Sequence, residues 1–335
     1  MAVKYVYADC AASAPILPCA MEAMRKSWGN PNSSHSSGRE ARAALKNARS
    51  VIARCIGAKP EQIGFTPSAT EAARIVMPYF NICSISEFEH KCVRETAGFC
   101  DILGFKDTKA VAHILANNET GVVYAEDVKE LSRHYAVFTD ATAAVGQIPI
   151  DVRELGVAAL SAGAHKFGGY PGIGFLYLRD GITDDISFPG TPPVALAVAM
   201  ANALEYRTDY IGKNLGHLLI QRGKLVEGLM KIEGATINGL HHLRLPNIVS
   251  VRFDGIDARE LLTLLDVNGV YASAGAACSA DDNEPSPVLL ASGLTEEQAR
   301  STIRLSFCPE NTAEDFDFVL EAVSRCVAQL RKLAV

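Results

Sequence analysis

The sequence lacks the long apolar run, of roughly eighteen residues, that a membrane-spanning helix needs. Its first residues lack a basic segment followed by an apolar core, so we expect no secretion signal. It also lacks an excess of basic charge, since 32 Lys and Arg stand against 38 Asp and Glu, for a formal net charge of −6. This balance argues against a protein that binds nucleic acid or another polyanion.

No two cysteines have the CxxC spacing of a redox or zinc motif. Their number is odd and they are scattered over a long chain, so we expect neither a disulfide framework nor a zinc ribbon, and we predict no metal site. A reducing cytoplasm is the expected compartment, with most of the thiols as small buried hydrophobic groups. The nine cysteines stand at positions 10, 19, 55, 83, 92, 100, 278, 308 and 326.

The chain of 335 residues is 48% hydrophobic, which is enough to bury a large core and to form two domains. It shows no internal repeat and no low-complexity segment. We expect a large domain over residues 14–212, and a smaller C-terminal domain made of residues 1–13 and 213–335.

Short apolar segments alternate with helical ones as far as residue 178, which predicts an α/β domain with a mainly parallel sheet. The remainder changes character and predicts a smaller α+β domain. The expected strands are 62–66, 82–86, 110–116, 136–139, 158–161, 174–178, 247–253 and 302–306. The expected helices are 17–28, 37–58, 192–232 with a break near Gly212, 258–267 and 312–333.

Lys166 is the most informative residue of the chain. It stands in Ala-His-Lys-Phe-Gly-Gly (164–169), between the apolar strands 158–161 and 174–178. A lysine in such a turn can enter a cleft at a strand end, where burial lowers its pKa and makes the amine a nucleophile toward an aldehyde. Pyridoxal phosphate needs such a lysine, although an isolated loop lysine is usually a surface group.

Ligands of open α/β sheets bind beyond the carboxyl ends of the strands. The turn after strand 62–66 offers backbone N–H groups, from Ala69 onward, and the Thr70 hydroxyl to a phosphate at a helix N-terminus. Asp140, at the end of strand 136–139, can pair with a pyridine nitrogen. Both segments are also consistent with ordinary helix caps.

Three further residues have suitable chemistry and an ordinary structural alternative. His90 can stack on a planar ring and transfer protons near neutral pH, but a lone histidine is often structural. The Asn-Asn-Glu-Thr-Gly segment 117–121 follows a strand and can reach a ring hydroxyl, or it is a plain turn. Arg304 lies opposite Ile303 and Leu305 on its strand and can bind a carboxylate with two parallel hydrogen bonds, as structural ion pairs also do.

Cys278 differs from the other cysteines because it lies in a stretch of small and polar residues, 272–285, without a core pattern. An accessible loop is where a thiolate nucleophile can reach a substrate. The alternative is an exposed thiol without a task.

Taken together and in this order, the segments resemble a cysteine desulfurase of the class V aminotransferase family. The resemblance runs from Tyr7 to Phe307 and implies a type I pyridoxal-phosphate-dependent transferase fold. It also implies a homodimer with active sites at the subunit interface. The most specific motifs are GNPNSSHSSGREAR (29–42), FTPSATEA (65–72), NNETG (117–121), DATAAVGQIPIDV (140–152), AHKFGG (164–169) and the Cys278 loop ending at 286.

The resemblance assigns a role to each candidate residue. Cys278 accepts the sulfur of L-cysteine as a persulfide, releases alanine and passes the sulfur to an acceptor, as in iron–sulfur cluster assembly. Arg304 binds the substrate carboxylate, with Asn118 nearby. Cofactor contacts are implied for Lys166 (Schiff base), Asp140 (pyridine nitrogen), His90 (ring stacking and acid–base catalysis), Asn118, for Ala69, Thr70 and His165 (phosphate), and for Thr191, whose contact crosses to the other subunit.

The sequence departs from the family pattern at Ala143, where glutamine is usual, and at Gly163, where a phosphate-binding serine is expected. The chain is also shorter between residues 79 and 110 and before Gly190. Three hypotheses follow: a cysteine desulfurase, a related selenocysteine lyase or aminotransferase in which Cys278 is incidental, and a catalytically weakened scaffold for sulfur-assembly partners.

Overall fold

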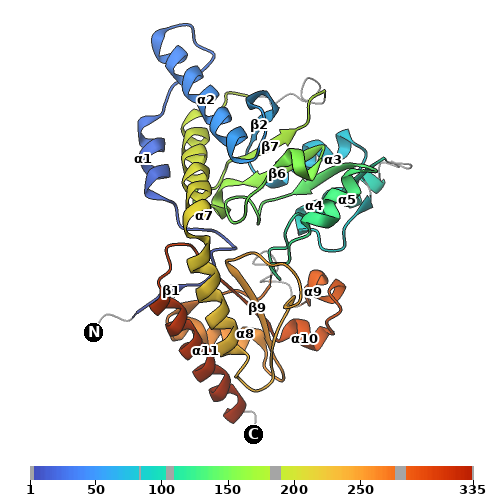
Figure 1. The fold of residues 1–335 in the computed structure, drawn as a ribbon, viewed down its shortest axis with the longest axis vertical. Coiled ribbons are helices and arrows are strands. Elements are labelled where there is room, and N and C mark those ends of the chain that lie inside the picture. Colours follow the sequence, from blue (N-terminus) through green and yellow to red (C-terminus); the bar gives the residue numbers. More distant parts are fainter. Residues whose placement is uncertain (1–3, 83, 103–108, 182–189, 276–283, 334–335) are drawn as a thin grey trace. The chain divides into compact units, whose positions relative to one another are not determined.

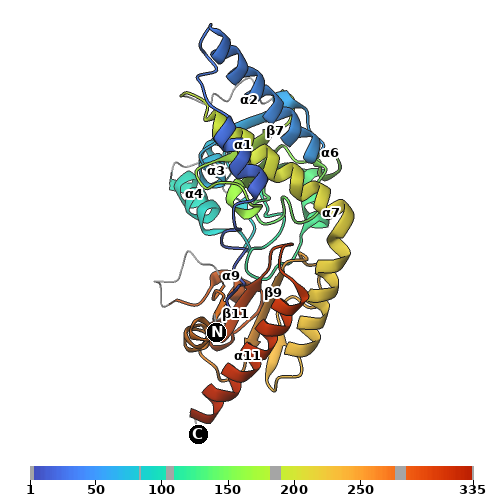
Figure 2. The ribbon, with the colours of Figure 1, turned by 90° about the vertical axis from the view of Figure 1, so that its left-hand side faces the viewer.

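The computed structural model describes residues 4–82, 84–102, 109–181, 190–275 and 284–333 (Figures 1 and 2). The chain separates into two compact units. The first unit consists of Met1–Ala12, Asn117–Val123 and Asn214–Val335, and the second of Ser13–Ala116 and Tyr124–Lys213. The expected boundaries differ from these by one residue at two points, and the segment Asn117–Val123 groups with the first unit instead of the large domain.

The second unit is built on a six-stranded sheet in the order β2-β7-β6-β5-β4-β3. Strand β7 is antiparallel to both of its neighbours, and the pairs from β6 to β3 are parallel. Five strands therefore run in one direction, which confirms the mainly parallel α/β fold, and their carboxyl ends share one edge. The strands are β2 (Ile63–Thr66), β3 (Ser84–Ile85), β4 (Ala110–Ala112), β5 (Ala136–Asp140), β6 (Ala159–Gly163) and β7 (Gly174–Leu178).

The helices of this unit follow the apolar stripes of the sequence. The stripe of α2 that includes Ala41, Leu45, Ala48 and Ile52 is buried, and His35 caps the helix by accepting a hydrogen bond from the Gly38 N–H at 3.2 Å. Helix α3 packs on the sheet with its alanines, Val76 and Met77. The helices are α1 (Pro18–Lys26), α2 (Ser36–Cys55), α3 (Ala69–Tyr79), α4 (Lys91–Ile102), α5 (Ala125–Ser132) and α6 (Val152–Leu155), with 3₁₀ turns η1 (Pro60–Gln62) and η2 (Ala164–Lys166).

Helix α7 (Val194–Leu229) is continuous over 36 residues and contributes to both units, so the expected break near Gly212 is wrong. A glycine inside a helix costs about 1 kcal/mol relative to alanine. The hydrogen bonds on either side outweigh that cost, and the space beside Gly212 is open. No helix in the described part of the chain is both long enough and apolar enough to cross a membrane.

The first unit has an antiparallel sheet in the order β11-β9-β8 and a two-stranded parallel pair of β1 and β10. Its core is formed by Val249, Val251, Ile303 and Leu305 with the apolar faces of three helices, which agrees with the expected α+β character. The strands are β1 (Val6–Tyr7), β8 (Ala235–Ile237), β9 (Ile248–Phe253), β10 (Val270–Tyr271) and β11 (Thr302–Ser306). The helices are α8 (Ala258–Val267), α9 (Pro287–Ala291), α10 (Glu296–Arg300) and α11 (Ala313–Leu333).

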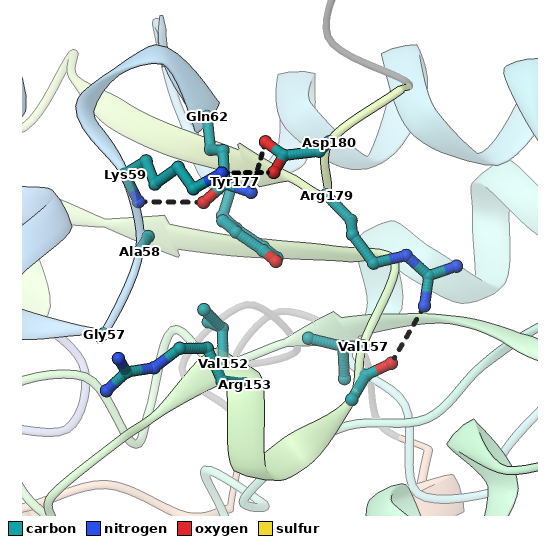
Figure 3. A pocket seen from close by; sticks show the side chains of 11 residues that line it. Gly57, Ala58, Lys59, Gln62, Val152, Arg153, Val157, Tyr177, Arg179 and Asp180 are labelled. Atoms are coloured by element: carbon teal, nitrogen blue, oxygen red, sulfur yellow. Dashed lines mark hydrogen bonds and ion pairs between the residues drawn. The ribbon is translucent and has the colours of Figure 1, made fainter.

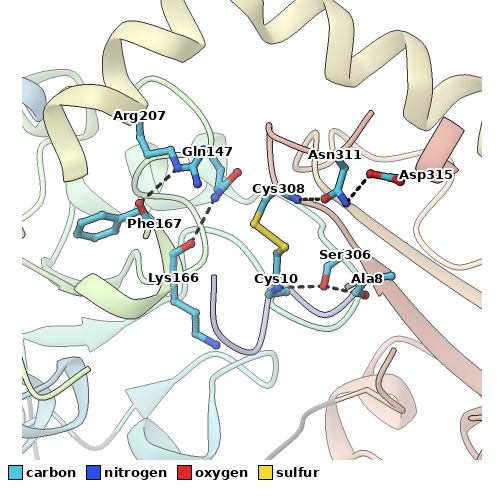
Figure 4. Close-up of a disulfide and its surroundings, with 11 residues drawn as sticks. Ala8, Cys10, Gln147, Lys166, Phe167, Arg207, Ser306, Cys308, Asn311 and Asp315 are labelled. Carbon is cyan, nitrogen blue, oxygen red and sulfur yellow. Dashed lines mark hydrogen bonds between the residues drawn. A yellow bond between two sulfur atoms is a disulfide. The ribbon is translucent and has the colours of Figure 1, made fainter. Parts of the chain in front are cut away.

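A disulfide joins Cys10 to Cys308 in the first unit, 298 residues apart in the sequence (Figure 4). The expectation of reduced cysteines is therefore wrong for this pair. The spacing of the two cysteines in the sequence does not predict this pair. The backbone bridge between Asp9 and Ser306 brings the two Cα atoms to 5.8 Å only in the folded chain, a separation suited to a disulfide. Cys19, Cys55, Cys92 and Cys326 are free thiols.

We expect Cys308→Ser to lower the free energy of unfolding by about 2–4 kcal/mol under oxidising conditions, because the disulfide closes a very long loop in the unfolded chain. Urea unfolding with and without dithiothreitol measures this difference. The reductant should lower the free energy of unfolding of the wild type to nearly that of Cys308→Ser. Cys19→Ser, a control at a half-buried free thiol, should respond to the reductant as the wild type does. A wild type that does not respond to the reductant contradicts the prediction.

Candidate active site

Four candidate segments follow the carboxyl ends of strands that share one edge of the sheet in the second unit. Thr66 ends β2 and leads to the first turn of α3, and Ile85 ends β3 and leads to His90. Asp140 is the last residue of β5, and Gly163 ends β6 directly before the η2 turn with Lys166. Since these strands run in the same direction, the sheet itself gathers the candidate groups at this edge.

Hydrogen bonds hold the η2 turn on both sides of Lys166. The Ala14 N–H donates to the His165 carbonyl at 2.8 Å, and the Gly169 N–H donates to the Ala164 carbonyl at 2.9 Å. The Gln147 amide donates to the Lys166 carbonyl at 3.4 Å (Figure 4). The main chain of the half-buried lysine is thus fixed while its amine stands at the end of a flexible side chain.

Behind this turn, Phe167 is fully buried and its carbonyl accepts a hydrogen bond from Arg207 Nε at 3.3 Å (Figure 4). Gly146 lies against it with a φ of +75°, and a Cβ there would stand 2.6 Å from the Phe167 Cβ. Only glycine satisfies both the left-handed backbone and this close approach. The contact between Phe167 and Gly146 thereby helps to fix the η2 turn that carries Lys166.

Asp140 is 5% exposed, and its Oδ1 accepts a hydrogen bond from the Thr142 N–H at 2.9 Å. The structural role that we considered for this residue, capping the following turn, is therefore present. A carboxylate with two oxygens can accept further hydrogen bonds, so capping and binding a ring nitrogen are compatible.

His90 stands directly before α4, in a loop anchored by an aromatic contact. Phe88 stacks on Tyr124 with ring centroids 5.0 Å apart. The His90 Nδ1 lies 3.0 Å from the Cys92 sulfur, and the Cys92 N–H donates to the same nitrogen at 3.3 Å. Our sequence analysis missed Cys92, although the His-x-Cys spacing was a usable signal.

Glu89 is the second residue that sequence reasoning missed. It is fully buried, and the Ile114 backbone and the charges of His90 and Arg94 compensate its carboxylate only in part. Burial, and secondarily the negative charge of Asp140, raise the pKa of Glu89 well above its ordinary value of 4.5. The pair Glu89 and Asp140 thus concentrates acidic groups at this edge of the sheet.

The raised pKa of Glu89 predicts a fall in stability with pH. Above about pH 4.5 the unfolded chain loses the Glu89 proton while the folded chain keeps it, so the free energy of unfolding falls until the folded pKa is passed. The slope is about 1.4 kcal/mol per pH unit at most. We expect Glu89→Gln to remove this component, as urea unfolding at a series of pH values would show. The exposed Glu95→Gln on α4 is the control, and parallel curves for wild type and Glu89→Gln contradict the prediction.

His165 stays neutral at pH 7, because burial and then the charges of Lys166 and His90 lower its pKa to about 4. The His165 ring also lies close to Gly163, where the family pattern has a serine. A Cβ on Gly163 would stand 3.1 Å from the His165 Cε1 and 3.2 Å from its Nδ1, so this ring crowds the place where a serine side chain begins.

Ala69 and Thr70 form the first turn of α3, and Ser68 caps the helix by accepting a hydrogen bond from the Glu71 N–H at 3.1 Å. The first N–H groups of a helix have no partner within it, and they lie at the positive end of the helix dipole. Gly174 of β7 lies directly beside this turn, with its Cβ position 3.2 Å from the Ala69 nitrogen. The turn can therefore receive an anion such as a phosphate.

Arg304 lies in the first unit, where the structure brings it together with Asn118 and Asp9. The side chain is 1% exposed, its Nη1 donates to the Asn118 carbonyl at 2.9 Å, and its Nη2 pairs with the Asp9 carboxylate at 2.7 Å. Its Nε is buried and has no hydrogen-bond partner among the described residues. Our sequence analysis did not predict the role of Asp9, which fixes the guanidinium.

Two candidates are not brought to a site by the described structure. Cys278 lies outside the described residues. Thr191 is exposed, and its contact with another subunit stays a prediction.

A pocket of about 440 Å³ in the second unit, shown in Figure 3, contains none of the candidate residues. It lies at the other edge of the sheet, where β2 begins and β7 ends. Lys59 pairs with Asp180 at 2.6 Å, and Arg179 donates to the Gly156 carbonyl at 3.4 Å. Because none of the candidate residues lines this pocket, it is not the candidate site.

The Lys166 edge fits pyridoxal phosphate. Asp140 suits the ring nitrogen, and the first turn of α3 suits the phosphate. Two buried hydroxyls nearby, Ser161 Oγ and Thr142 Oγ1, have no hydrogen-bond partner among the described residues. Ser161 is the register partner of Asp140, and the Thr142 methyl lies 3.7 Å from the Cβ position of Gly163. A bound group with oxygen acceptors supplies the partners that such hydroxyls need.

Comparisons with known proteins agree with this geometry. The family described as aminotransferase class-V matches residues 6–94, 86–188 and 183–319. Cysteine desulfurase IscS of Methanosarcina thermophila is 32% identical over 379 aligned positions, which cover 99% of this chain and 94% of the relative. The IscS-like cysteine desulfurase of Mycobacterium tuberculosis is 33% identical, with 98% of both chains covered.

Solved structures give the same result. A NifS-like protein superimposes with a TM-score of 0.86 at 30% identity, covering 97% of this chain and all of that one. SspA in complex with cysteine has a TM-score of 0.76 at 26% identity, with 91% of this chain and 99% of that chain covered. The chain therefore belongs to the aminotransferase class-V family, among the pyridoxal-phosphate-dependent cysteine desulfurases.

Proposed function

We propose that this chain removes sulfur from L-cysteine at the Lys166 edge of the sheet and gives L-alanine and a persulfide on Cys278. The observation that carries the proposal is the convergence of Lys166, Asp140, His90 and the first turn of α3 on one sheet edge. Bound there, pyridoxal phosphate would supply the electron withdrawal that acidifies the Cα of the substrate.

The protein's own groups supply the binding and the proton transfers. Asp140 holds the ring nitrogen, while Ala69, Thr70 and His165 receive the phosphate, as Thr191 of another subunit also does. His90 stacks on the ring, and Asn118 contributes a further contact. Lys166 holds the cofactor at rest and then, with its amine released, moves the Cα proton of cysteine.

Arg304 binds the substrate carboxylate. The Asp9 carboxylate and the Asn118 carbonyl orient its guanidinium, and a rigid fork of donors suits a carboxylate better than a flexible ammonium group does. This contact selects amino acids as substrates and orients the sulfur of cysteine.

Cys278 accepts the sulfur. Its thiolate attacks the substrate sulfur, so that an S–S bond forms as the substrate C–S bond breaks, and a proton delivered to the Cβ completes alanine. The persulfide then passes its outer sulfur to an acceptor protein. We propose that the acceptor belongs to iron–sulfur cluster assembly, that the chain acts as a cytoplasmic homodimer, and that residues 14–212 are its cofactor-binding domain.

The test is persulfide mapping by mass spectrometry after incubation with L-cysteine, with alanine release measured in parallel. We expect the wild type to show a persulfide at Cys278, and Cys278→Ala to form none there and to lose desulfurase turnover by roughly 10²-fold or more. Alanine release that is equal with and without Cys278 favours a lyase instead. No cofactor absorption after reconstitution with excess pyridoxal phosphate favours the scaffold hypothesis. Cys55→Ala, at a half-buried thiol on α2, is the matched control.

A further inference from the structure

Three side chains of different ligand type meet at the candidate cofactor site. His90 offers a ring nitrogen, Cys92 a sulfur and Asp140 a carboxylate oxygen, and these three atoms all lie within 4.8 Å of one another. They come from the loop before α4, from the first turn of α4 and from the end of β5. Tertiary structure thus adds the Asp140 carboxylate to the His90-x-Cys92 pair, which gives a mixed nitrogen, sulfur and oxygen set.

The separations suit one small cation. His90 Nδ1 and Cys92 Sγ lie 3.0 Å apart. Bond lengths of about 2.0–2.3 Å in a tetrahedral zinc site place ligand atoms roughly 3.3–3.8 Å apart, so shifts of about an ångström or less convert the present arrangement into a zinc site. A fourth ligand, such as water, completes the coordination.

The surroundings favour a cation as well. Cys92 and Asp140 are 8% and 5% exposed, so their ligand atoms are largely removed from bulk water. Partial removal from water strengthens the attraction between a cation and the Asp140 carboxylate.

We propose that His90, Cys92 and Asp140 form a binding site for a thiophilic divalent cation such as Zn²⁺ in the cofactor-free protein, and that the cation and pyridoxal phosphate exclude each other. Binding replaces the Cys92 thiol proton by a metal–sulfur bond and releases the proton to solvent, without any redox change. The metal site rests on the geometry alone. The exclusion of the cofactor rests on the proposed cofactor contacts of His90 and Asp140, because a bound metal would engage the same two side chains.

Co²⁺ is the spectroscopic probe for the sulfur ligand, and Zn²⁺ measured by calorimetry gives the affinity. Both are added to the full chain stripped of cofactor, in a Cys278→Ala background that removes the loop thiol. We expect a thiolate-to-cobalt charge-transfer band that Cys92→Ala abolishes, together with a loss of roughly 100-fold in Zn²⁺ affinity. Cys55→Ala should keep both signals. No such band, or an equal band in Cys92→Ala, overturns the metal site.

Competition is measured separately, as the uptake of pyridoxal phosphate followed by its visible absorption. Preloading with Zn²⁺ should block this uptake, a chelator should restore it, and the Cys92→Ala variant should take up cofactor whether or not Zn²⁺ is present. The cofactor-loaded protein should show no cobalt–thiolate band. A metal that binds through Cys92 without affecting cofactor uptake overturns the exclusion, and with it the assigned roles of His90 and Asp140, while the metal site itself stands.

Discussion

Replacing Lys166 with alanine is expected to abolish the covalent attachment of pyridoxal phosphate and to lower cysteine turnover by at least about 10³-fold. The amine is the group that both holds the cofactor and moves the substrate proton, so one deletion removes two functions. The fold should survive, because the contact from Gln147 goes to the Lys166 carbonyl, which alanine retains. Borohydride reduction followed by peptide mass spectrometry checks the attachment, and circular dichroism checks the fold.

Lys46→Ala, at an exposed lysine of α2, is the matched control and should keep both cofactor and activity. A cofactor-bearing peptide that contains another lysine in the wild type contradicts the assignment of Lys166 directly. Added methylamine provides a second test, since an external amine can partly replace the missing proton transfer in the variant without restoring attachment to the chain.

Replacing Arg304 with lysine is the second large expected effect. Lysine keeps the charge but loses the planar fork, so we expect kcat/KM for L-cysteine to fall by roughly 10²-fold, mostly through a raised KM. Stability should fall as well. Arg304 is buried against Asp9 and the Asn118 carbonyl, and lysine keeps the charge but cannot make both contacts at once, so a buried acceptor left without its donor costs about 1–3 kcal/mol.

Asp9→Asn separates the structural role of Arg304 from its substrate role. This variant weakens the ion pair but leaves the guanidinium in place, so it should lower the melting temperature more than it raises KM. Steady-state kinetics and thermal unfolding of both variants give the comparison. If KM and stability change in the same proportion in Arg304→Lys and Asp9→Asn, Arg304 acts only as a structural residue and the substrate contact lies elsewhere.

The order of helices and strands could be predicted from the sequence because it depends on local periodicity. Strand β7 and helix α8 have the expected bounds, and the stripe of α2 is buried as its spacing predicts. Short strands such as β1 and β10 were missed, since two residues carry no period. The break expected at Gly212 was wrong because a local propensity of about 1 kcal/mol does not decide the course of a long helix.

By itself, the sequence determined the chemistry that is available. Lys166 in its glycine-rich turn, Asp140 at a strand end and the ordered motifs around them identify the family, because such residues have few other uses in that order. Only the tertiary structure decided which groups share a site. The parallel sheet brings His90 and Cys92 to Asp140, and β11 places Arg304 beside Asp9. The disulfide joins Cys10 to Cys308 across a sequence separation of 298 residues. The physical reason is that these contacts link residues far apart in the chain, where local patterns carry no information on distance.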